Sequence, residues 1–384
     1  MVLQRGSILG SFNHLPVGSP CFLADKLYLC AAPWWRIDRC RGDEKTTETM
    51  NIIIPMAGMG KRMRPHTVTT PKPLVPIAGK PMVHRIVEDI VNTTDQTIGE
   101  IAFVISRLFG EQAEKDLLAV AASFGATGKI FYQDEPLGTA HAILCASECL
   151  TGNTFIAFAD TLFKATFSID TSKDAIIWTQ KVADPSAFGV VKMDESGRIT
   201  EFIEKPKEFV SDLAIIGVYY FRDGENLKAE LQYLIDNDIR LKNEYQITDA
   251  MENMNRKGLH FYSDQVEEWL DCGNKDATLY TLERVLEIKK ETENLIMPTA
   301  RIENATIIPP CFIGDNVEVR NSVIGPYVSL EAGVVVESSV IRRSIIGNHS
   351  LVQSANLHLS LLGNHVSVQG KADELSLGDY SFTK

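Results

Sequence analysis

The C-terminal part of the chain carries an internal repeat, and no other feature constrains the fold as strongly. Each unit opens with an aliphatic residue and a glycine and closes four positions later on valine or serine. Copies lie at 313–317, 324–328, 346–350 and 362–366. Such a repeat is typical of a parallel β-helix, whose coils cannot bury their apolar edges alone and are stabilised by stacking. We therefore predict a β-helix domain over residues 296–384.

Between residues 50 and 295, short apolar runs alternate with amphipathic segments. The predicted strands are 52–54, 101–105, 130–132 and 154–158, and the predicted helices are 83–91, 110–124, 138–149 and 274–293. This alternation predicts a mainly parallel sheet with helices on both faces. Ligands of such sheets bind at the carboxyl ends of the strands. The residues that follow each strand are therefore the first candidates for a site.

The first 49 residues differ from the rest of the chain. They hold three of the seven cysteines and the pair Trp34–Trp35, and they show neither helical nor strand periodicity. They also lack the basic, apolar and small-residue order of a signal peptide. Met50 stands directly before the first predicted strand. We expect residues 1–49 to be a poorly structured extension that folding and activity do not require.

Charge and cysteine usage exclude several classes of protein. The formal net charge is -12, which argues against a partner that is nucleic acid or a membrane surface. No run of 18 apolar residues is present, so no membrane span is expected. The seven cysteines show no zinc-site spacing, and their odd number favours free thiols. We expect a globular protein of the reducing cytoplasm.

The segment after the first predicted strand combines a glycine turn with basic residues. A Walker A loop requires glycine where Pro55 stands, and the dinucleotide fingerprint requires a third glycine where Met63 stands. Glycines behind a strand still expose N–H groups that can wrap phosphate oxygens. The residues alone leave open a phosphate site or a tight turn beside a solvated charge run. The cations concerned are Lys61, Arg62, Arg64, Lys72 and Lys80.

Seven motifs, in order, resemble those of the sugar-1-phosphate nucleotidyltransferases, which include glucose-1-phosphate thymidylyltransferases and mannose-1-phosphate guanylyltransferases. They are the opening segment 57–81, then 133–140, Asp160, 188–191, 204–206, 244–249 and 269–273. The resemblance covers roughly residues 50–290 and implies an α/β fold with a Rossmann-like mixed, mainly parallel sheet, followed by a short left-handed parallel β-helix. Lys61, where many members have threonine, departs from the pattern. So does Asn274, where some members have threonine.

By this resemblance the enzyme joins a nucleoside triphosphate to a sugar-1-phosphate and releases pyrophosphate. Positioning and charge neutralisation are the tasks of such a site. Arg62 is expected to hold the β- and γ-phosphates, and Lys72 to bridge the α-phosphate and the sugar phosphate. The other nucleotide-binding residues implied are Ala57, Gly58, Gly60, Gln133, Gly138 and Thr139.

The resemblance also implies a metal site and a sugar site. Asp160 and Asp271 are expected to hold Mg²⁺, a hard cation that prefers carboxylate and phosphate oxygens. Gly189, Glu204 and Lys205 are expected to bind the sugar and its phosphate. Simpler interpretations stand beside these: Asp160 as a turn residue, Asp271 as the cap of the following helix, and Glu204–Lys205 as a solvated pair.

Two other functions compete with this one. Left-handed β-helices host acyltransferases that use a histidine, and His349 and His365 occupy the same place in two repeats, with His358 between them. A regulatory paralogue that binds nucleotide-sugar without turnover is the second. The β-helix is more simply expected to mediate contacts of a homo-oligomer.

The substrate pair stays open at this stage. The sequence favours glucose-1-phosphate with dTTP or UTP, with mannose-1-phosphate guanylyl transfer as the alternative. Base choice depends on a few hydrogen bonds near Gln133 that sequence does not orient.

Overall fold

The computed structural model describes residues 49–164, 168–371 and 373–383. The described residues form one compact unit. The predicted extension falls almost wholly outside the described residues. Its last residue, Thr49, is the first residue of strand β1, and the next residue, Met50, is fully buried.

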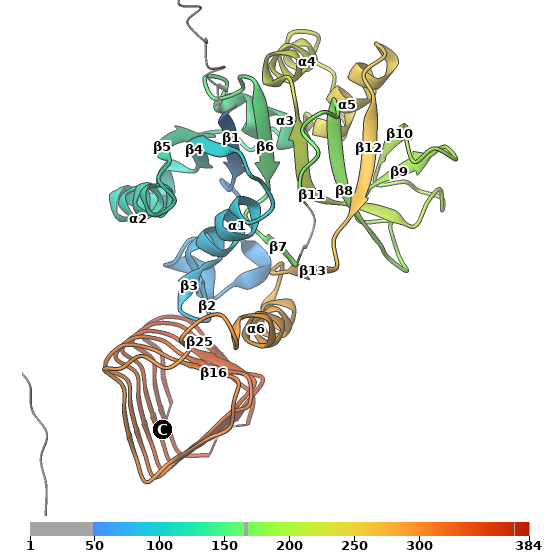
Figure 1. The fold of residues 1–384 in the computed structure, drawn as a ribbon. Helices are drawn as coiled ribbons and strands as arrows, with labels where there is room; N and C mark the ends of the chain where they lie inside the picture. The colour runs from blue at the N-terminus through green and yellow to red at the C-terminus, as the bar shows by residue number, and fades with distance from the viewer. Residues whose placement is uncertain (1–48, 165–167, 372, 384) are drawn as a thin grey trace, which may run out of the picture. The chain divides into compact units, whose positions relative to one another are not determined.

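A mixed sheet forms the centre of the N-terminal part (Figure 1). The strand order is β10-β9-β11-β6-β1-β4-β5, with β8 paired to β11 and β12 paired to β8. Strands β6, β1, β4 and β5 are parallel, whereas β11 runs antiparallel to β6. The strands are β1 (Thr49–Pro55), β4 (Thr97–Ile105), β5 (Thr127–Tyr132), β6 (Asn153–Ala157), β8 (Ala175–Lys181), β9 (Gly189–Met193), β10 (Ile199–Glu204), β11 (Leu213–Phe221) and β12 (Phe261–Gln265).

Helices cover both faces of this sheet, as the sequence predicts. Ile52 and Ile54 of β1 enter a core shared with α1, α2 and α6, while Ile53 enters the opposite core with α3, α4 and α5. A fully buried strand of this kind has no polar face, which explains its unbroken apolar run. The helices are α1 (Met82–Val91), α2 (Gly110–Ser123), α3 (Thr139–Cys145), α4 (Gly224–Asp236), α5 (Ile247–Arg256) and α6 (Lys275–Lys289). Helix α3 is shorter than the predicted 138–149.

Short elements link the sheet to the C-terminal domain. The antiparallel pair β7 (Thr161–Lys164) and β13 (Glu268–Asp271) joins two segments that are far apart in the sequence. Helix α6 follows β13 directly. The remaining short elements are the hairpin β2 (Pro76–Ile77) and β3 (Lys80–Pro81), and the 3-10 turns η1 (Lys61–Met63), η2 (His66–Val68), η3 (Lys72–Leu74) and η4 (Arg107–Phe109).

The C-terminal domain is a left-handed parallel β-helix with a triangular outline (Figure 1). Its first sheet stacks β14 (Arg301–Glu303), β17 (Glu318–Arg320), β20 (Val335–Glu337), β23 (Leu351–Gln353), β26 (Ser367–Gln369) and β28 (Phe382–Thr383). The second stacks β15 (Thr306–Ile307), β18 (Val323–Ile324), β21 (Val340–Arg342) and β24 (Asn356–His358). The third stacks β16 (Cys311–Ile313), β19 (Val328–Leu330), β22 (Ser344–Ile346), β25 (Leu361–Leu362) and β27 (Ser376–Leu377).

The repeat units of the sequence lie at the corners of this triangle. Units 313–317, 346–350 and 362–366 share one corner, but 324–328 forms a different corner, between β18 and β19. Residues with positive φ occupy the shared corner in successive coils: Asn316, Gly333, His349, His365 and Tyr380. Stacking also aligns Val319, Val336, Val352 and Val368 inside the helix, all essentially fully buried.

The two domains share apolar contacts. Phe312, Ile345 and Leu361 of the β-helix belong to the same core as α1 and α6. The ring of Phe312 lies directly against Gly79, in the turn between β2 and β3. No helix among the described residues has the length and apolar character needed to cross a membrane.

Candidate active site

The glycine turn after β1, residues 58–60, packs against Thr67 and Lys72. Gly60 has a φ of 56°, and its carbonyl accepts a hydrogen bond of 2.8 Å from the Thr67 hydroxyl. A Cβ placed on Gly60 would come within 3.0 Å of Lys72 Cβ and of Thr67 Cγ2. Only glycine combines this left-handed conformation with so close an approach. The turn and Lys72 therefore form one structural unit.

Gly58 and Arg62 lie on the open side of this turn. A Cβ on Gly58 would meet nothing within 4 Å, so no protein packing requires a glycine there. Arg62 is exposed in η1, and its guanidinium reaches toward Gly273 and the Asp271 carboxylate. An exposed backbone beside an exposed guanidinium is suited to binding successive phosphate groups.

The pairing of β7 with β13 brings the two predicted metal ligands together. Asp160 immediately precedes β7, Asp271 ends β13, and Asp271 stands opposite Thr161 in the ladder. The Cys272 backbone N–H donates to the Asp160 carbonyl at 3.1 Å. Two carboxylates that are 111 positions apart in the numbering thus share one site.

Lys72 supplies the positive charge of this site. Its side chain is buried, and its Nζ donates to Asp160 Oδ2 at 2.8 Å. Burial raises the pKa of Asp271, and the neighbouring Asp160 raises it further, while Lys72 and Arg62 oppose the shift. Two close carboxylates repel each other, so the pair favours a bound cation.

The predicted base-binding residues lie after β5, at the carboxyl edge of the parallel strands. The Gln133 amide donates to the Gly138 carbonyl at 3.1 Å and lies 3.1 Å from His141 Nδ1. Gly138 has a φ of 106°, and a Cβ there would come within 2.5 Å of the Tyr245 carbonyl. Gly138 is therefore required by close packing against the segment before α5, whatever its role toward a nucleotide.

Thr139 has a structural partner at the start of α5. Its hydroxyl lies 3.2 Å from Gln246 Oε1 and accepts a 3.0 Å hydrogen bond from the Ile247 backbone N–H. The side chain joins α3 to α5, and its nucleotide-binding role remains a prediction.

The predicted sugar-binding residues meet where β9 pairs with β10. Glu204 stands opposite Gly189, and a Cβ on Gly189 would come within 2.9 Å of Glu204 Oε2. The Thr248 hydroxyl donates to the same oxygen at 3.3 Å, and Lys205 Nζ lies 3.4 Å from Glu204 Oε1. Glu204 is thus oriented by protein contacts and is not a freely solvated carboxylate.

The structure separates Lys80 from the other cations that follow the glycine turn. Lys80 bonds Glu88 and Glu293 at 2.8 and 3.2 Å, in a cluster of charged side chains near α1 and the end of α6.

The cap of α6 is Asn274, whose side chain accepts from the Ala277 backbone N–H at 3.0 Å. Asp271 is therefore left free of the capping role that the sequence allowed.

Sequence reasoning did not single out two residues that shape the site, Gly273 and Thr67. Gly273 leaves room between Asp271 and Arg62, because a Cβ there would lie 2.8 Å from the Asp271 carboxylate. Thr67 holds the glycine turn through its hydrogen bond to the Gly60 carbonyl. Each lies within one of the seven motifs, so its position in a motif was the available signal.

Two histidines of the β-helix, His349 and His365, stack at one corner. The rings of His349 and His365 stack at 5.3 Å, and those of His365 and Tyr380 at 5.0 Å. All three side chains are exposed. The stack accounts for the recurrence of histidine in the repeat, and acyl transfer remains an untested alternative.

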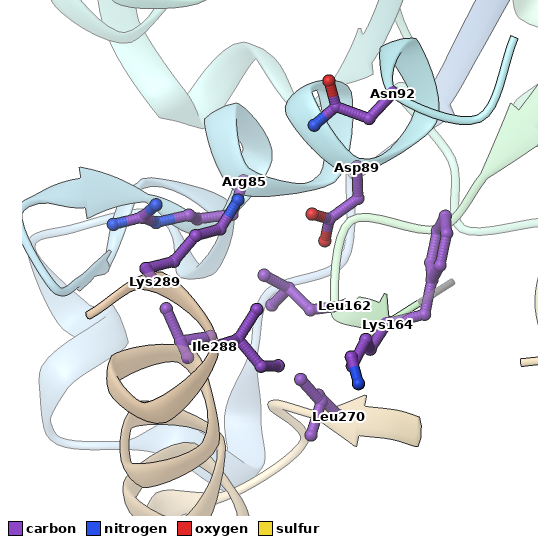
Figure 2. A pocket seen from close by; sticks show the side chains of 10 residues that line it. Arg85, Asp89, Asn92, Leu162, Lys164, Leu270, Ile288 and Lys289 are labelled. Atoms are coloured by element: carbon purple, nitrogen blue, oxygen red, sulfur yellow. The ribbon is translucent and has the colours of Figure 1, made fainter. Parts of the chain in front are cut away.

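A cavity lies between α1, α6 and the β7–β13 pair. It has a volume of about 180 Å³ and is lined by residues of α1, α6, β7 and β13. Asp89 points from α1 toward Leu162, with Lys289 and Arg85 nearby (Figure 2). None of the predicted substrate-binding residues lines it.

The glycine turn, a buried ammonium and two carboxylates lie together at the carboxyl edge of the parallel strands, the position where ligands of α/β enzymes bind. The family model described as nucleotidyl transferase matches residues 51–287, well over half of the chain. The chain belongs to the sugar-1-phosphate nucleotidyltransferase family.

Individual relatives agree with this assignment. The chain is 30% identical over 320 residues to the glucose-1-phosphate thymidylyltransferase of Streptomyces griseus, covering 77% of this chain and 87% of that protein. It is 36% identical over 178 residues to the catalytic subunit beta of mannose-1-phosphate guanylyltransferase from Drosophila melanogaster, covering 44% of this chain and 47% of that one. A crystal structure of UDP-glucose pyrophosphorylase complexed with UDP-glucose superposes with a TM-score of 0.51 at 23% identity, covering 63% of this chain and 100% of the other. At that identity the superposition shows the fold alone.

Proposed function

We propose that the enzyme transfers a nucleotidyl group from dTTP or UTP to glucose-1-phosphate, with Mg²⁺ bound by Asp160 and Asp271. The observation that carries the proposal is the 2.8 Å contact of Lys72 with Asp160, beside Asp271 and directly behind the glycine turn. In this proposal the Lys72 ammonium neutralises the α-phosphate and the sugar phosphate where the two substrates meet. Similarity to glucose-1-phosphate thymidylyltransferases over 77% of the chain favours glucose-1-phosphate with dTTP.

The residues of the chain support an in-line displacement. An oxygen of the sugar phosphate attacks the α-phosphorus, a new P–O bond forms, and the bond to the β-phosphate oxygen breaks, so that pyrophosphate leaves with its electron pair. Lys72 neutralises charge on the α-phosphate and the attacking phosphate, while Arg62 holds the leaving phosphates. No covalent intermediate with the protein is needed.

The two aspartates fit a magnesium ion that is completed by substrate. Among the described residues, no cluster of three His, Cys, Asp or Glu side chains forms a cage for a metal. Mg²⁺ is typically held by one or two carboxylates together with substrate phosphates and water. When bound, it supplies charge neutralisation at the triphosphate. Burial and the adjacent Asp160 raise the pKa of Asp271, so ionising this carboxyl group costs free energy in the free protein. A bound divalent ion would offset that cost.

Guanylyl transfer to mannose-1-phosphate is the second candidate. It is favoured by the 36% identity to a guanylyltransferase subunit, although this extends over only 178 residues. A paralogue without turnover would be expected to lose Arg62, Lys72, Asp160 or Asp271, and all four are present. A homo-oligomer in the cytoplasm remains our expectation for the assembled enzyme.

Pyrophosphate release tests the proposal directly. The wild-type enzyme is assayed with dTTP, UTP, GTP, CTP and ATP, each with glucose-, mannose- and N-acetylglucosamine-1-phosphate, with and without Mg²⁺. Lys72→Ala and Asp160→Asn should each lower kcat on the order of a hundredfold or more. Lys192→Ala, which removes a surface pair with Glu201, is the matched control and should keep wild-type turnover. Full turnover by either site variant contradicts the mechanism.

A further inference from the structure

The last coil of the β-helix contacts the loop that follows the glycine turn. His66 Nε2 lies 3.2 Å from Ser376 Oγ, and the Thr69 hydroxyl donates to Asp379 Oδ2 at 2.5 Å. Gly378 packs against Pro65, since a Cβ on Gly378 would lie 3.1 Å from Pro65 Cβ. Residues more than 300 positions apart thus meet beside the phosphate turn.

The two hydrogen-bonded residues, His66 and Thr69, lie on either side of Thr67 in the sequence. Thr67, which bonds the Gly60 carbonyl, lies in the short turn η2 between His66 and Thr69. The segment 61–74 contains only 3-10 turns of three residues each, which make few hydrogen bonds of their own. Its order must therefore come from contacts with other elements.

The partner on the β-helix is itself fixed. Asp379 accepts a hydrogen bond from the Asn364 backbone N–H through Oδ1 at 2.6 Å, and Thr69 uses its other oxygen. His66 is buried, and this burial lowers its pKa to about 4 against the opposing charge of Asp379, so it is neutral at pH 7. A cavity of about 270 Å³ lies beside these bonds, so the contact depends on polar bonds more than on close packing.

The same end of the β-helix holds the segment that follows Asp271. Lys275, the first residue of α6, donates to the Leu359 carbonyl at 3.3 Å and pairs with Glu374. Asp271 lies four residues before Lys275. The segments that carry Gly60 and Asp271 are therefore both attached to the last coils of the β-helix.

We propose that the last coil of the β-helix, residues 373–381, positions the phosphate turn of the active site through Ser376–His66 and Asp379–Thr69. These four are positioning residues: none of them touches the reacting atoms, and they act through Thr67 and Gly60. The inference rests on the proposed function. The sugar-binding residues lie on β9, β10 and α5 and do not depend on this contact.

Kinetics of matched variants test the proposal. Thr69→Val removes the bond to Asp379, and Thr69→Ser keeps the hydroxyl. Thr299→Val is the control, because Thr299 donates the same kind of hydrogen bond to Asp315, at 2.7 Å, in the first coil. Thr69→Val combined with Ser376→Ala should raise KM for the nucleoside triphosphate and lower kcat/KM on the order of tenfold or more, with KM for the sugar-1-phosphate unchanged. The single variants Thr69→Ser and Thr299→Val should each keep the wild-type KM and kcat/KM for both substrates.

Hydrogen exchange gives a second readout that does not depend on turnover. The amides of residues 58–69 should lose protection in the double variant and keep it in Thr299→Val. If wild-type enzyme turns over no substrate pair, the proposed function fails, and exchange still decides the positioning role. Wild-type kinetics in the double variant, or unchanged protection of residues 58–69, would overturn the inference.

Discussion

At the scale of single residues, the two glycines of the glycine turn differ in whether the fold requires them to be glycine. Gly60 must be glycine for the fold, because its φ is 56° and Lys72 and Thr67 crowd it. Gly58 has open space where a side chain would stand. A glycine that packing does not require points to a ligand that approaches the backbone closely.

Gly58→Ala tests this distinction. We expect the melting temperature to stay close to that of the wild type, because the new Cβ meets no protein atom within 4 Å. KM for the nucleoside triphosphate should rise on the order of tenfold, because the methyl group would obstruct phosphate approach. Calorimetry and pyrophosphate release measure the two effects. An unchanged KM would support a turn without a phosphate-binding role.

At the scale of elements, the packing of α1 against β7, β13 and α6 buries ionisable groups below the site (Figure 2). Burial raises the pKa of Asp89 to about 7, although Lys289 and Arg85 oppose the shift and the Phe163 backbone N–H donates to the carboxyl group. Its neighbour Glu88 behaves oppositely: hydrogen bonds from Lys80 and Lys289 outweigh burial and lower its pKa to about 2. Adjacent carboxylates on one helix thus contribute to stability with opposite dependence on pH.

Asp89→Asn isolates one of these contributions. The folded protein holds the Asp89 proton more tightly than the unfolded chain, so this residue lowers stability as pH rises from about 4 to about 7. Asparagine cannot ionise, and the variant should gain stability relative to the wild type over that range, by up to about 4 kcal/mol at pH 8.

Urea unfolding at pH 5 and pH 8 measures this difference. Asp170→Asn is the control, because Asp170 is exposed and hydrogen bonds from Ser172 lower its pKa. This variant should show no gain in stability at pH 8. A stability difference between Asp89→Asn and the wild type that stays constant between the two pH values would contradict the assignment.

At the scale of the whole molecule, the catalytic domain and the β-helix share a core. Phe312, at 9% exposure, packs on Gly79 and belongs to the same cluster as α1 and α6. Hydrogen bonds from Tyr327 and Arg343 to α6 add polar contacts along the same boundary. Domains joined by an apolar interface are expected to unfold together.

Phe312→Ala should therefore destabilise both domains. We expect a loss of about 3 kcal/mol and a single calorimetric transition, as in the wild type. Phe382→Ala, which removes a ring that is 73% exposed on the last strand, should change stability little. Two separate transitions, with only the β-helix affected by Phe312→Ala, would show that the domains unfold independently.

The sequence alone determined the local features of this protein. Apolar periodicity predicted the buried strands and the helices on both faces, because these patterns depend on neighbours in the chain. The repeat predicted the β-helix, although it grouped units 324–328 and 346–350 that lie at different corners. The seven motifs identified the family and the residues of the candidate site.

Only the tertiary structure decided which of these residues meet. The β7–β13 pair brings Asp271 beside Asp160, the buried Lys72 joins Asp160, and Lys80 is drawn into ion pairs with Glu88 and Glu293. His66 contacts Ser376 although the two residues are 310 positions apart in the sequence. Such pairings depend on how sheets and coils close over long separations, and no local pattern of residues encodes that closure.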